Sequence, residues 1–144
     1  MNIKIQSMTL TDLDMISSNL ISDFDEFWSY SILKDELESK SSYYIVAKLG
    51  TEIIGFAGIK VLLDEADIMN IVTKKSYRKK GVGSILLQNL IELSSNLNLK
   101  SITLEVNESN LPAINLYKKF NFEKIGFRKN YYKDQNAIIM LRIL

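Results

Sequence analysis

The sequence contains no cysteine and no histidine. The absence of cysteine excludes disulfides and thiol nucleophiles, and the absence of histidine removes the commonest metal ligand and the commonest general base. Any chemistry that this chain performs must therefore use carboxylates, hydroxyls, amines or the backbone. We expect no metal site.

A strong excess of charge is also missing, because 18 lysine and arginine residues face 17 aspartate and glutamate residues, for a formal net charge of +1. No overall field therefore favours nucleic acid or an anionic membrane. The sequence has no apolar run near the roughly 18 residues of a transmembrane helix, and the N-terminal segment MNIKIQSM lacks the apolar core of a signal peptide. We expect a cytoplasmic protein, a monomer or weak dimer, that binds neither membrane nor nucleic acid directly.

The chain does have an ordinary globular composition, with 47% hydrophobic and 24% charged residues over 144 positions, which predicts a single domain spanning residues 1–144. Alternation around Ile3 and Ile5 indicates a first strand. Thr11, with Asp14 three residues later, matches a capping box that opens a helix toward Leu20. A second helix is expected over residues 31–38.

Two runs rich in β-formers lie on either side of Gly50, and the segment ADIMNIV follows an acidic turn, so we expect three antiparallel neighbours. Apolar residues then recur at a helical period from Val82: Ile85, Leu86, Leu90, Ile91 and Leu93. A strand is expected over residues 101–106. A helix over residues 110–120 has Ser109 as cap and Pro112 in its first turn. NFEKIGF and AIIMLRIL complete an α/β chain in the order βααβββαβαββ.

The segment YRKKGVGSILL, residues 77–87, combines three consecutive cations, two glycines and the start of an apolar helix. The first turn of a helix has unpaired N–H groups and the positive end of the helix dipole, so this combination favours a bound anion, and a phosphate fits best. The spacing is neither a Walker P-loop nor a good dinucleotide fingerprint. A solvated basic turn is the alternative, but the strand before the loop and the helix after it favour convergence of the amides of Gly81, Val82, Gly83 and Ser84.

At these residues the chain resembles the GNAT family of N-acetyltransferases, because RKKGVG matches the acetyl-CoA loop pattern Arg/Gln-x-x-Gly-x-Gly/Ala. The element order resembles that fold over essentially the whole chain. The resemblance implies acetyl-CoA as co-substrate and a mixed, mostly antiparallel seven-stranded sheet flanked by helices. DEADIMNIV, LEVNESN, AINLY and RKNYY are similar to family members that acetylate the N-terminal alanine of a small-subunit ribosomal protein. Such a protein N-terminus is therefore the implied acceptor.

The resemblance also implies which residues bind the co-substrate. The pyrophosphate is held mainly by backbone N–H groups of Arg78, Lys79, Lys80, Gly81, Val82, Gly83 and Ser84. Ile71, Val72 and Thr73 lie on a splayed strand whose free main-chain groups pair with the pantetheine arm and the thioester carbonyl. Asn110 and Tyr117 contact the cofactor near its thiol end.

Glu105 is the candidate general base. Alternation in SITLEVN places Thr103, Glu105 and Asn107 on one face of a strand. An exposed-face glutamate is the ordinary reading, but a strand flanked in sequence by two helices suggests cover on both faces, where an idle charge is costly. The resemblance assigns Glu105 as general base. Asn107 is a weaker candidate for holding a water molecule near it.

Tyr117 is the candidate general acid, a role that the family gives to a tyrosine here and for which a phenol with a pKa of about 10 is suited. A core aromatic on a helix is its ordinary alternative. With neither cysteine nor histidine available, an acyl-enzyme route through either is impossible, and direct attack of an amine on the thioester is expected.

The acceptor can be narrowed by proton chemistry. At pH near 7.4 an α-amine with a pKa of about 7.8 is roughly one quarter neutral, whereas lysine is neutral only about one part in a thousand. An α-amine is therefore the easier nucleophile. Four aromatic residues could line a peptide entrance or pack in the core: Trp28, Tyr30, Tyr131 and Tyr132. Arg128 precedes the last two as in the family's Arg-x-x-Tyr-Tyr pattern.

Two departures and two rival functions complete the prediction. Asn121 stands where the family usually has glycine, and asparagine tolerates the same left-handed helix end. Asn136 replaces a common acidic residue and puts peptide selectivity in doubt. A GNAT enzyme for small amines such as a polyamine or antibiotic is one rival, with Asp23, Asp25 and Glu26 as acidic contacts. A non-catalytic acyl-CoA-binding module is the other.

Overall fold

The computed structural model describes residues 1–144, with only the backbone described for Tyr132. It contains two compact units, residues 1–60 with 69–90 and residues 61–68 with 91–144. The strands hydrogen-bond in the order β1-β2-β3-β4-β5-β7-β6, and β4 contributes residues to both units. This mixed, mostly antiparallel seven-stranded sheet confirms the expected fold class.

The helices of the first unit follow a short strand. The elements are β1 (Ile3–Ser7), α1 (Leu10–Ile16), the 3₁₀ turn η1 (Ser17–Asn19), α2 (Leu20–Phe24) and α3 (Tyr30–Glu38). The predicted capping box was wrong by two residues, since Thr9 accepts from the Asp12 amide at 3.1 Å and donates its own amide to Asp12 at 2.9 Å. Both candidate boxes have the same spacing, but the start at Thr9 turns Leu13 and Ile16 into the core. The short α2 was not predicted.

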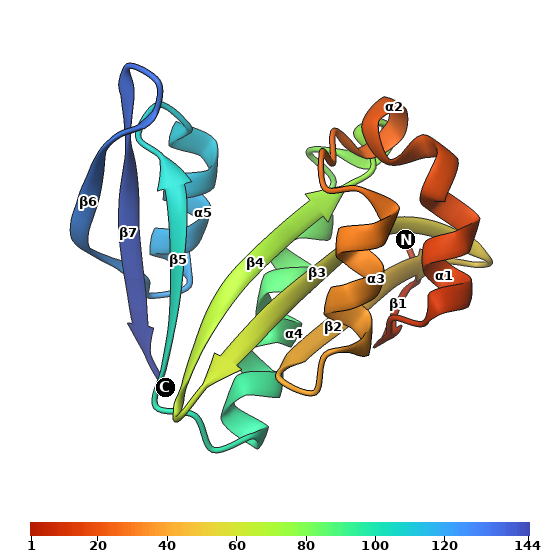
Figure 1. The fold of residues 1–144 in the computed structure, drawn as a ribbon, viewed down its shortest axis with the longest axis horizontal. Coiled ribbons are helices and arrows are strands. Elements are labelled where there is room, and N and C mark those ends of the chain that lie inside the picture. The colour runs from red at the N-terminus through yellow and green to blue at the C-terminus, as the bar shows by residue number, and fades with distance from the viewer. The chain divides into compact units, whose positions relative to one another are not determined.

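The strands of the first unit are β2 (Ser42–Leu49), β3 (Glu52–Leu62) and the end of β4 (Glu65–Thr73). β2 and β3 form the predicted antiparallel hairpin around Gly50, whose φ is +63°. In Figure 1, α1 and α3 lie on one side of these strands and α4 (Val82–Asn96) lies on the other. The core under α1–α3 includes Leu13, Phe24, Leu33, Val46 and Phe56.

The second unit is centred on β7 (Gln135–Ile143), which pairs antiparallel with β5 (Ser101–Asn107) and β6 (Glu123–Tyr132). Residues 65–67 of β4 pair parallel with residues 101–103 of β5. The helix α5 (Leu111–Lys119) is capped by Asn110, not by Ser109 as predicted, because the Asn110 side chain accepts from the Ala113 amide at 3.3 Å. Asn121 has a φ of 66°, which confirms the left-handed helix end. Among the described residues no helix is both long enough and apolar enough to cross a membrane.

A buried polar chain links β2 and β4 of the first unit to the connection between α2 and α3. The Tyr44 hydroxyl on β2 donates to Asn70 Oδ1 on β4 at 2.5 Å, and Asn70 Nδ2 donates to Glu26 Oε2 at 3.1 Å. Glu26 also accepts from the Trp28 amide at 3.0 Å. Burial raises the pKa of the Tyr44 phenol well above its ordinary value, with nearby carboxylates adding to the effect. The chain ties the connection between α2 and α3 to the middle of the sheet.

Gly58 on β3 makes room for this arrangement, because it pairs with Tyr44 and a Cβ there would lie 2.3 Å from the Tyr44 ring. We expect Gly58→Ala to destabilise the protein by about 1–3 kcal/mol, since overpacking would displace the ring from Asn70. Gly126→Ala is the matched control, because the nearest atom to its added Cβ is 3.9 Å away. Urea unfolding of both variants measures the difference, and equal midpoints would show that the ring moves aside without cost.

Candidate active site

The predicted anion loop ends in a left-handed turn immediately before α4. Lys79 has a φ of 62° and Gly81 a φ of +86°, a backbone region that suits glycine. The first helical hydrogen bond runs from the Ile85 amide to the Gly81 carbonyl at 3.1 Å. The amides of the first residues of α4, Val82, Gly83 and Ser84, therefore have no partner within the helix, as an anion site requires.

The charge of the loop supports the same chemistry. Lys79 and Lys80 are exposed, and no carboxylate lies within ion-pair distance of either among the described residues. The Lys80 ammonium lies 5.4 Å from the centroid of the Tyr77 ring. The Val82 side chain is buried, so this residue can offer a ligand only its amide. A phosphate group fits this donor set.

Ile71, Val72 and Thr73 are the last residues of β4 and are half-buried. The Val72 side chain packs against the core beneath α1–α3, which leaves the main chain as the part of this residue that could serve a ligand. The splay expected at these three residues stays a prediction.

Glu105 lies on the open face of β5, so the expectation that this strand is covered on both faces was wrong. Ile102, Leu104 and Val106 are buried on one face, whereas the Glu105 side chain retains 29% of its accessible surface. The alternation of the sequence was therefore right, but helices that flank a strand in sequence do not have to cover both of its faces. Burial gives no support to the assignment of Glu105 as base.

Arg128 is the partner of Glu105, a role that sequence reasoning missed. Arg128 Nε on β6 donates to Glu105 Oε1 on β5 at 2.5 Å, and β7 lies between the two strands. The residue of β7 paired with Arg128 is Ala137, whose small side chain leaves room for the guanidinium to reach across. The ion pair orients the carboxylate. Arg128 was noted only for its place in the RKNYY segment, because pairing across two strand spacings depends on register.

Three predicted residues of the second unit have structural contacts of their own. Tyr117 on α5 is half-buried, and its ring centroid lies 6.0 Å from that of Phe122. Asn110 uses its side-chain oxygen to cap α5. The Asn107 side-chain oxygen accepts from both the amide and the hydroxyl of Ser109 at 2.9 Å, so it supports a turn. None of these contacts excludes the predicted ligand roles of Tyr117 and Asn110.

The three acidic residues of the small-amine rival are used differently from one another. Asp25 Oδ1 accepts from Lys75 Nζ at 3.0 Å and Asp25 Oδ2 accepts from Arg78 at 2.9 Å. The hydrogen bond from Lys75 and then that from Arg78 hold the pKa of Asp25 below its ordinary value. Glu26 is buried in the polar chain with Asn70. Asp23 lines a cavity.

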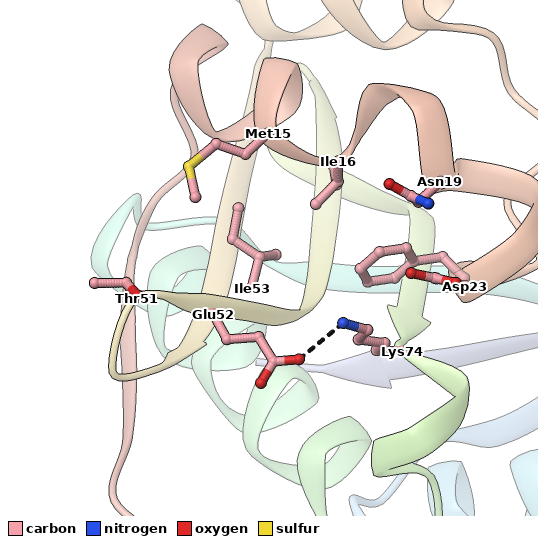
Figure 2. Close-up of a pocket in the computed structure, with 9 residues that line it drawn as sticks. Met15, Ile16, Asn19, Asp23, Thr51, Glu52, Ile53 and Lys74 are labelled. Carbon is pink, nitrogen blue, oxygen red and sulfur yellow. Dashed lines mark hydrogen bonds and ion pairs between the residues drawn. The ribbon is translucent and has the colours of Figure 1, made fainter.

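That cavity has a volume of about 170 Å³ and lies in the first unit (Figure 2). Nine residues line it: Met15, Ile16, Asn19, Asp23, Phe24, Thr51, Glu52, Ile53 and Lys74. None of them was predicted to take part in catalysis or co-substrate binding. At its edge Glu52 accepts from Lys74 Nζ and from the Tyr77 hydroxyl, each at 2.8 Å. These two hydrogen bonds, Lys74 first, lower the pKa of Glu52. Lys74 precedes the 3₁₀ turn η2 (Lys75–Tyr77), and Tyr77 is its last residue. This turn leads into the anion loop.

The aromatic candidates for a peptide entrance differ in their surroundings. Trp28 packs against the core, and the Tyr30 hydroxyl donates to Asp14 at 2.7 Å. Tyr131 is exposed, with its ring 6.0 Å from the Arg128 guanidinium carbon, and the side chain of Tyr132 lies outside the described residues. Phe27, which the sequence did not single out, is 76% exposed.

The sheet order and a cationic, glycine-bearing loop before α4 together define a GNAT-type acyltransferase. The chain belongs to the acetyltransferase (GNAT) family, whose family model matches residues 10–122. The chain is thus an N-acetyltransferase by family.

Relatives and solved structures agree with this membership. A Bacillus subtilis (strain 168) protein, provisionally named as a ribosomal protein bS18-alanine N-acetyltransferase, is 35% identical over 139 residues, 94% of this chain and 92% of its own. The crystal structure of the ribosomal-protein-S18-alanine N-acetyltransferase from Escherichia coli superposes with a TM-score of 0.90 at 28% identity, over 99% of this chain and 94% of that one. A GNAT acetyltransferase from Elizabethkingia anophelis, solved with acetyl-CoA bound, shares the fold with a TM-score of 0.81 at 22% identity over 99% of both chains.

Proposed function

We propose that this chain transfers the acetyl group of acetyl-CoA to the N-terminal α-amine of a protein, with an alanine-starting ribosomal protein as acceptor. The observation that carries the proposal is the similarity to ribosomal-protein-alanine N-acetyltransferases over more than nine-tenths of the chain. The donor side is supported independently by the loop before α4. A relative's acceptor is the best guide to this one, because acceptor choice depends on surface contacts that composition does not reveal.

The resemblance to the family gives the roles on the donor side, and the local geometry of the loop before α4 supports the first of them. The amides of Val82, Gly83 and Ser84, with the exposed charges of Lys79 and Lys80, would bind the pyrophosphate. Arg78 and Gly81 complete this segment. The main chain of residues 71–73 would pair with the pantetheine arm, and Asn110 and Tyr117 would contact the thiol end. Acetyl-CoA supplies a thioester whose acyl carbon accepts the amine.

The chain's own residues would move two protons. As the C–N bond forms and the C–S bond breaks, Glu105 takes the proton that the amine loses, directly or through one water, and the Tyr117 phenol gives a proton to the departing sulfur. The Arg128 ion pair fixes the Glu105 carboxylate at Oε1. Arg128 thereby limits the orientations that the base can adopt. No nucleophilic residue is consumed, in keeping with a chain without cysteine or histidine.

The acceptor is tested with a pair of peptides that differ in which amine is available. A peptide that begins with alanine should be acetylated on its N-terminus, whereas the same peptide with a blocked N-terminus and an internal lysine should not be, because lysine is neutral only about one part in a thousand near pH 7.4. Mass spectrometry locates the acetyl group, and spermidine serves as the small-amine comparison.

Three outcomes decide between the functions. Acetylation mainly on lysine, or only of spermidine, would reject the α-amine acceptor and leave the family assignment intact. Binding of acetyl-CoA with no transfer to any amine would favour the non-catalytic module. The engagement of Asp25 and Glu26 within the protein favours the peptide over the small amine, because two of the three acids proposed for an amine site already have partners.

A further inference from the structure

Two carboxylates hold the segment that leads from β4 into the anion loop. Four of the five residues at positions 74–78 have side chains bonded to either Glu52 or Asp25. Both carboxylates and all of their partners lie in the first unit. The segment is therefore attached on one side to the start of β3 and on the other to the end of α2.

Glu52 brackets the turn η2 from the β3 side. One of its oxygens accepts from Lys74 Nζ and the other from the Tyr77 hydroxyl, each at 2.8 Å, so a single carboxylate joins the residue before η2 to its last residue. Backbone bonds close the same unit, since the Lys74 amide donates to the Ile54 carbonyl and the Tyr77 amide donates to the Lys74 carbonyl, both at 2.8 Å. The turn is thus fixed by side chains and main chain together.

Asp25 holds the opposite side. It is the left-handed C-cap of α2, with a φ of 53°, and it accepts from Lys75 Nζ and from the Arg78 guanidinium. Arg78 is the first residue of the anion loop. Its side chain therefore has a defined position in the protein without any ligand.

The cavity beside this segment leaves room in which the Lys74 side chain could move. Lys74 lines a space of about 170 Å³ together with Asp23, which carries a second carboxylate in the same lining (Figure 2). Without Glu52, the Lys74 side chain could turn toward Asp23, and η2 would lose its attachment to β3. The loop that follows contains two left-handed residues, Lys79 and Gly81, whose geometry sets where the α4 amides point.

We propose that Glu52 and Tyr77 are positioning residues for acetyl-CoA: they hold η2 so that the loop over residues 78–84 is arranged for the pyrophosphate before the ligand arrives. This inference rests on the proposed function of that loop. Order that exists before binding does not have to be created during binding, so its removal weakens affinity for acetyl-CoA without altering the reacting groups.

Glu52→Gln distinguishes positioning from simple electrostatics, because the two predict opposite signs. Removal of a negative charge near a polyanionic ligand should tighten binding if only the field matters. If Glu52 positions the loop, the same change should weaken binding, because the neutral amide loses the charged partner of Lys74 and keeps Tyr77 only if its hydroxyl turns from donor to acceptor. Tyr77→Phe provides the charge-neutral version, since it deletes only the hydroxyl that donates to Glu52.

We expect both variants to raise the Kd and KM for acetyl-CoA by about threefold to tenfold, with kcat and the acceptor KM within about twofold of wild type. Calorimetry and steady-state kinetics measure these quantities, and thermal unfolding reports the folded fraction. Glu36→Gln is the matched control: Glu36 also accepts from a lysine, Lys60 at 3.4 Å, and from a hydroxyl, Ser42 at 2.6 Å, but these partners lie on β3 and β2 and not in η2. It should leave the affinity for acetyl-CoA unchanged.

The result that overturns the inference is unchanged or tighter binding in folded Tyr77→Phe and Glu52→Gln. A lower kcat together with a higher KM for both acetyl-CoA and the acceptor would also overturn it, because that pattern indicates a general structural role. Gly83→Asp separates this failure from failure of the proposed function. If Gly83→Asp abolishes binding while Tyr77→Phe does not weaken it, the loop assignment stands and the positioning role fails; if Gly83→Asp binds normally, the loop assignment itself fails.

Discussion

Gly83→Asp is expected to abolish binding of acetyl-CoA in a protein that still folds. Gly83 is the second residue of α4, where the amides have no helical partner and a phosphate would approach the backbone. A new carboxylate about 4 Å from a phosphate charge costs about 4 kcal/mol at an effective dielectric constant of about 20. Solvent around the loop reduces that repulsion, and steric contact of the side chain adds to the loss, so we expect affinity to fall by at least about 100-fold.

The fold should survive this substitution, because an acidic residue in the first turn of a helix is favourable by about 0.3–1 kcal/mol and glycine is a poor helix former. Gly83→Ala is the control that adds a methyl group without charge, and it should lose less affinity than the aspartate variant. Calorimetric titration with acetyl-CoA, after circular dichroism has established folding, gives the answer. Wild-type affinity in folded Gly83→Asp would reject the assignment of residues 78–84 to the pyrophosphate.

Glu105→Gln should lower kcat by roughly 100-fold or more while acetyl-CoA affinity stays near that of wild type, which is the usual consequence of losing a general base. The amide keeps the shape of the side chain and can still accept from Arg128, whose bond to Glu105 Oε1 is 2.5 Å long. The rate of the variant should recover in part as the pH rises, because the acceptor amine then loses its proton without help.

Glu123→Gln serves as the control for this experiment. It removes a carboxylate at the start of β6, and Glu123 has no proposed role in catalysis or binding. Stopped-time assays of thiol release across pH 6.5 to 9, an interval of about 2.5 units around the α-amine pKa, would record both profiles. Turnover of Glu105→Gln equal to wild type at neutral pH would remove Glu105 from the mechanism. Equal losses in both variants would indicate a field effect and not proton transfer.

The sequence predicted the candidate site unevenly, and the reasons are local. The anion loop could be predicted because its cations, glycines and helix start are adjacent in the chain; the backbone there has a left-handed Gly81 followed by α4, and the binding role stays a prediction. The Glu105 argument was half right. Alternation placed its side chain correctly, but cover of a face depends on which elements pack there, and that depends on contacts between residues far apart in the chain.

Side-chain partners that lie far apart in the chain could not be predicted from the sequence either. Arg128 meets Glu105 only because β6 and β5 pair on either side of β7 in one particular register, and a shift of one residue would turn Arg128 to the other face. Glu52 and Asp25 meet the segment before the loop from elements that lie 22 to 53 positions away in sequence. No local pattern marks such pairs.

The sequence by itself determined the seven strands, the helices α1, α3, α4 and α5 and their order, because helical period, strand alternation and turn residues are properties of neighbouring positions. It also predicted the anion loop. Membership of the GNAT family was expected from the resemblance of the RKKGVG loop and of the element order, and the family model over residues 10–122 confirms it. Only the tertiary structure decided that Glu105 faces outward beside Arg128, that Glu26 in the connection between α2 and α3 is buried, and that Glu52 and Asp25 hold the entry to the loop. The physical reason is that burial and ion pairing depend on distances in space, which strand register and helix packing set between residues that no sequence spacing connects.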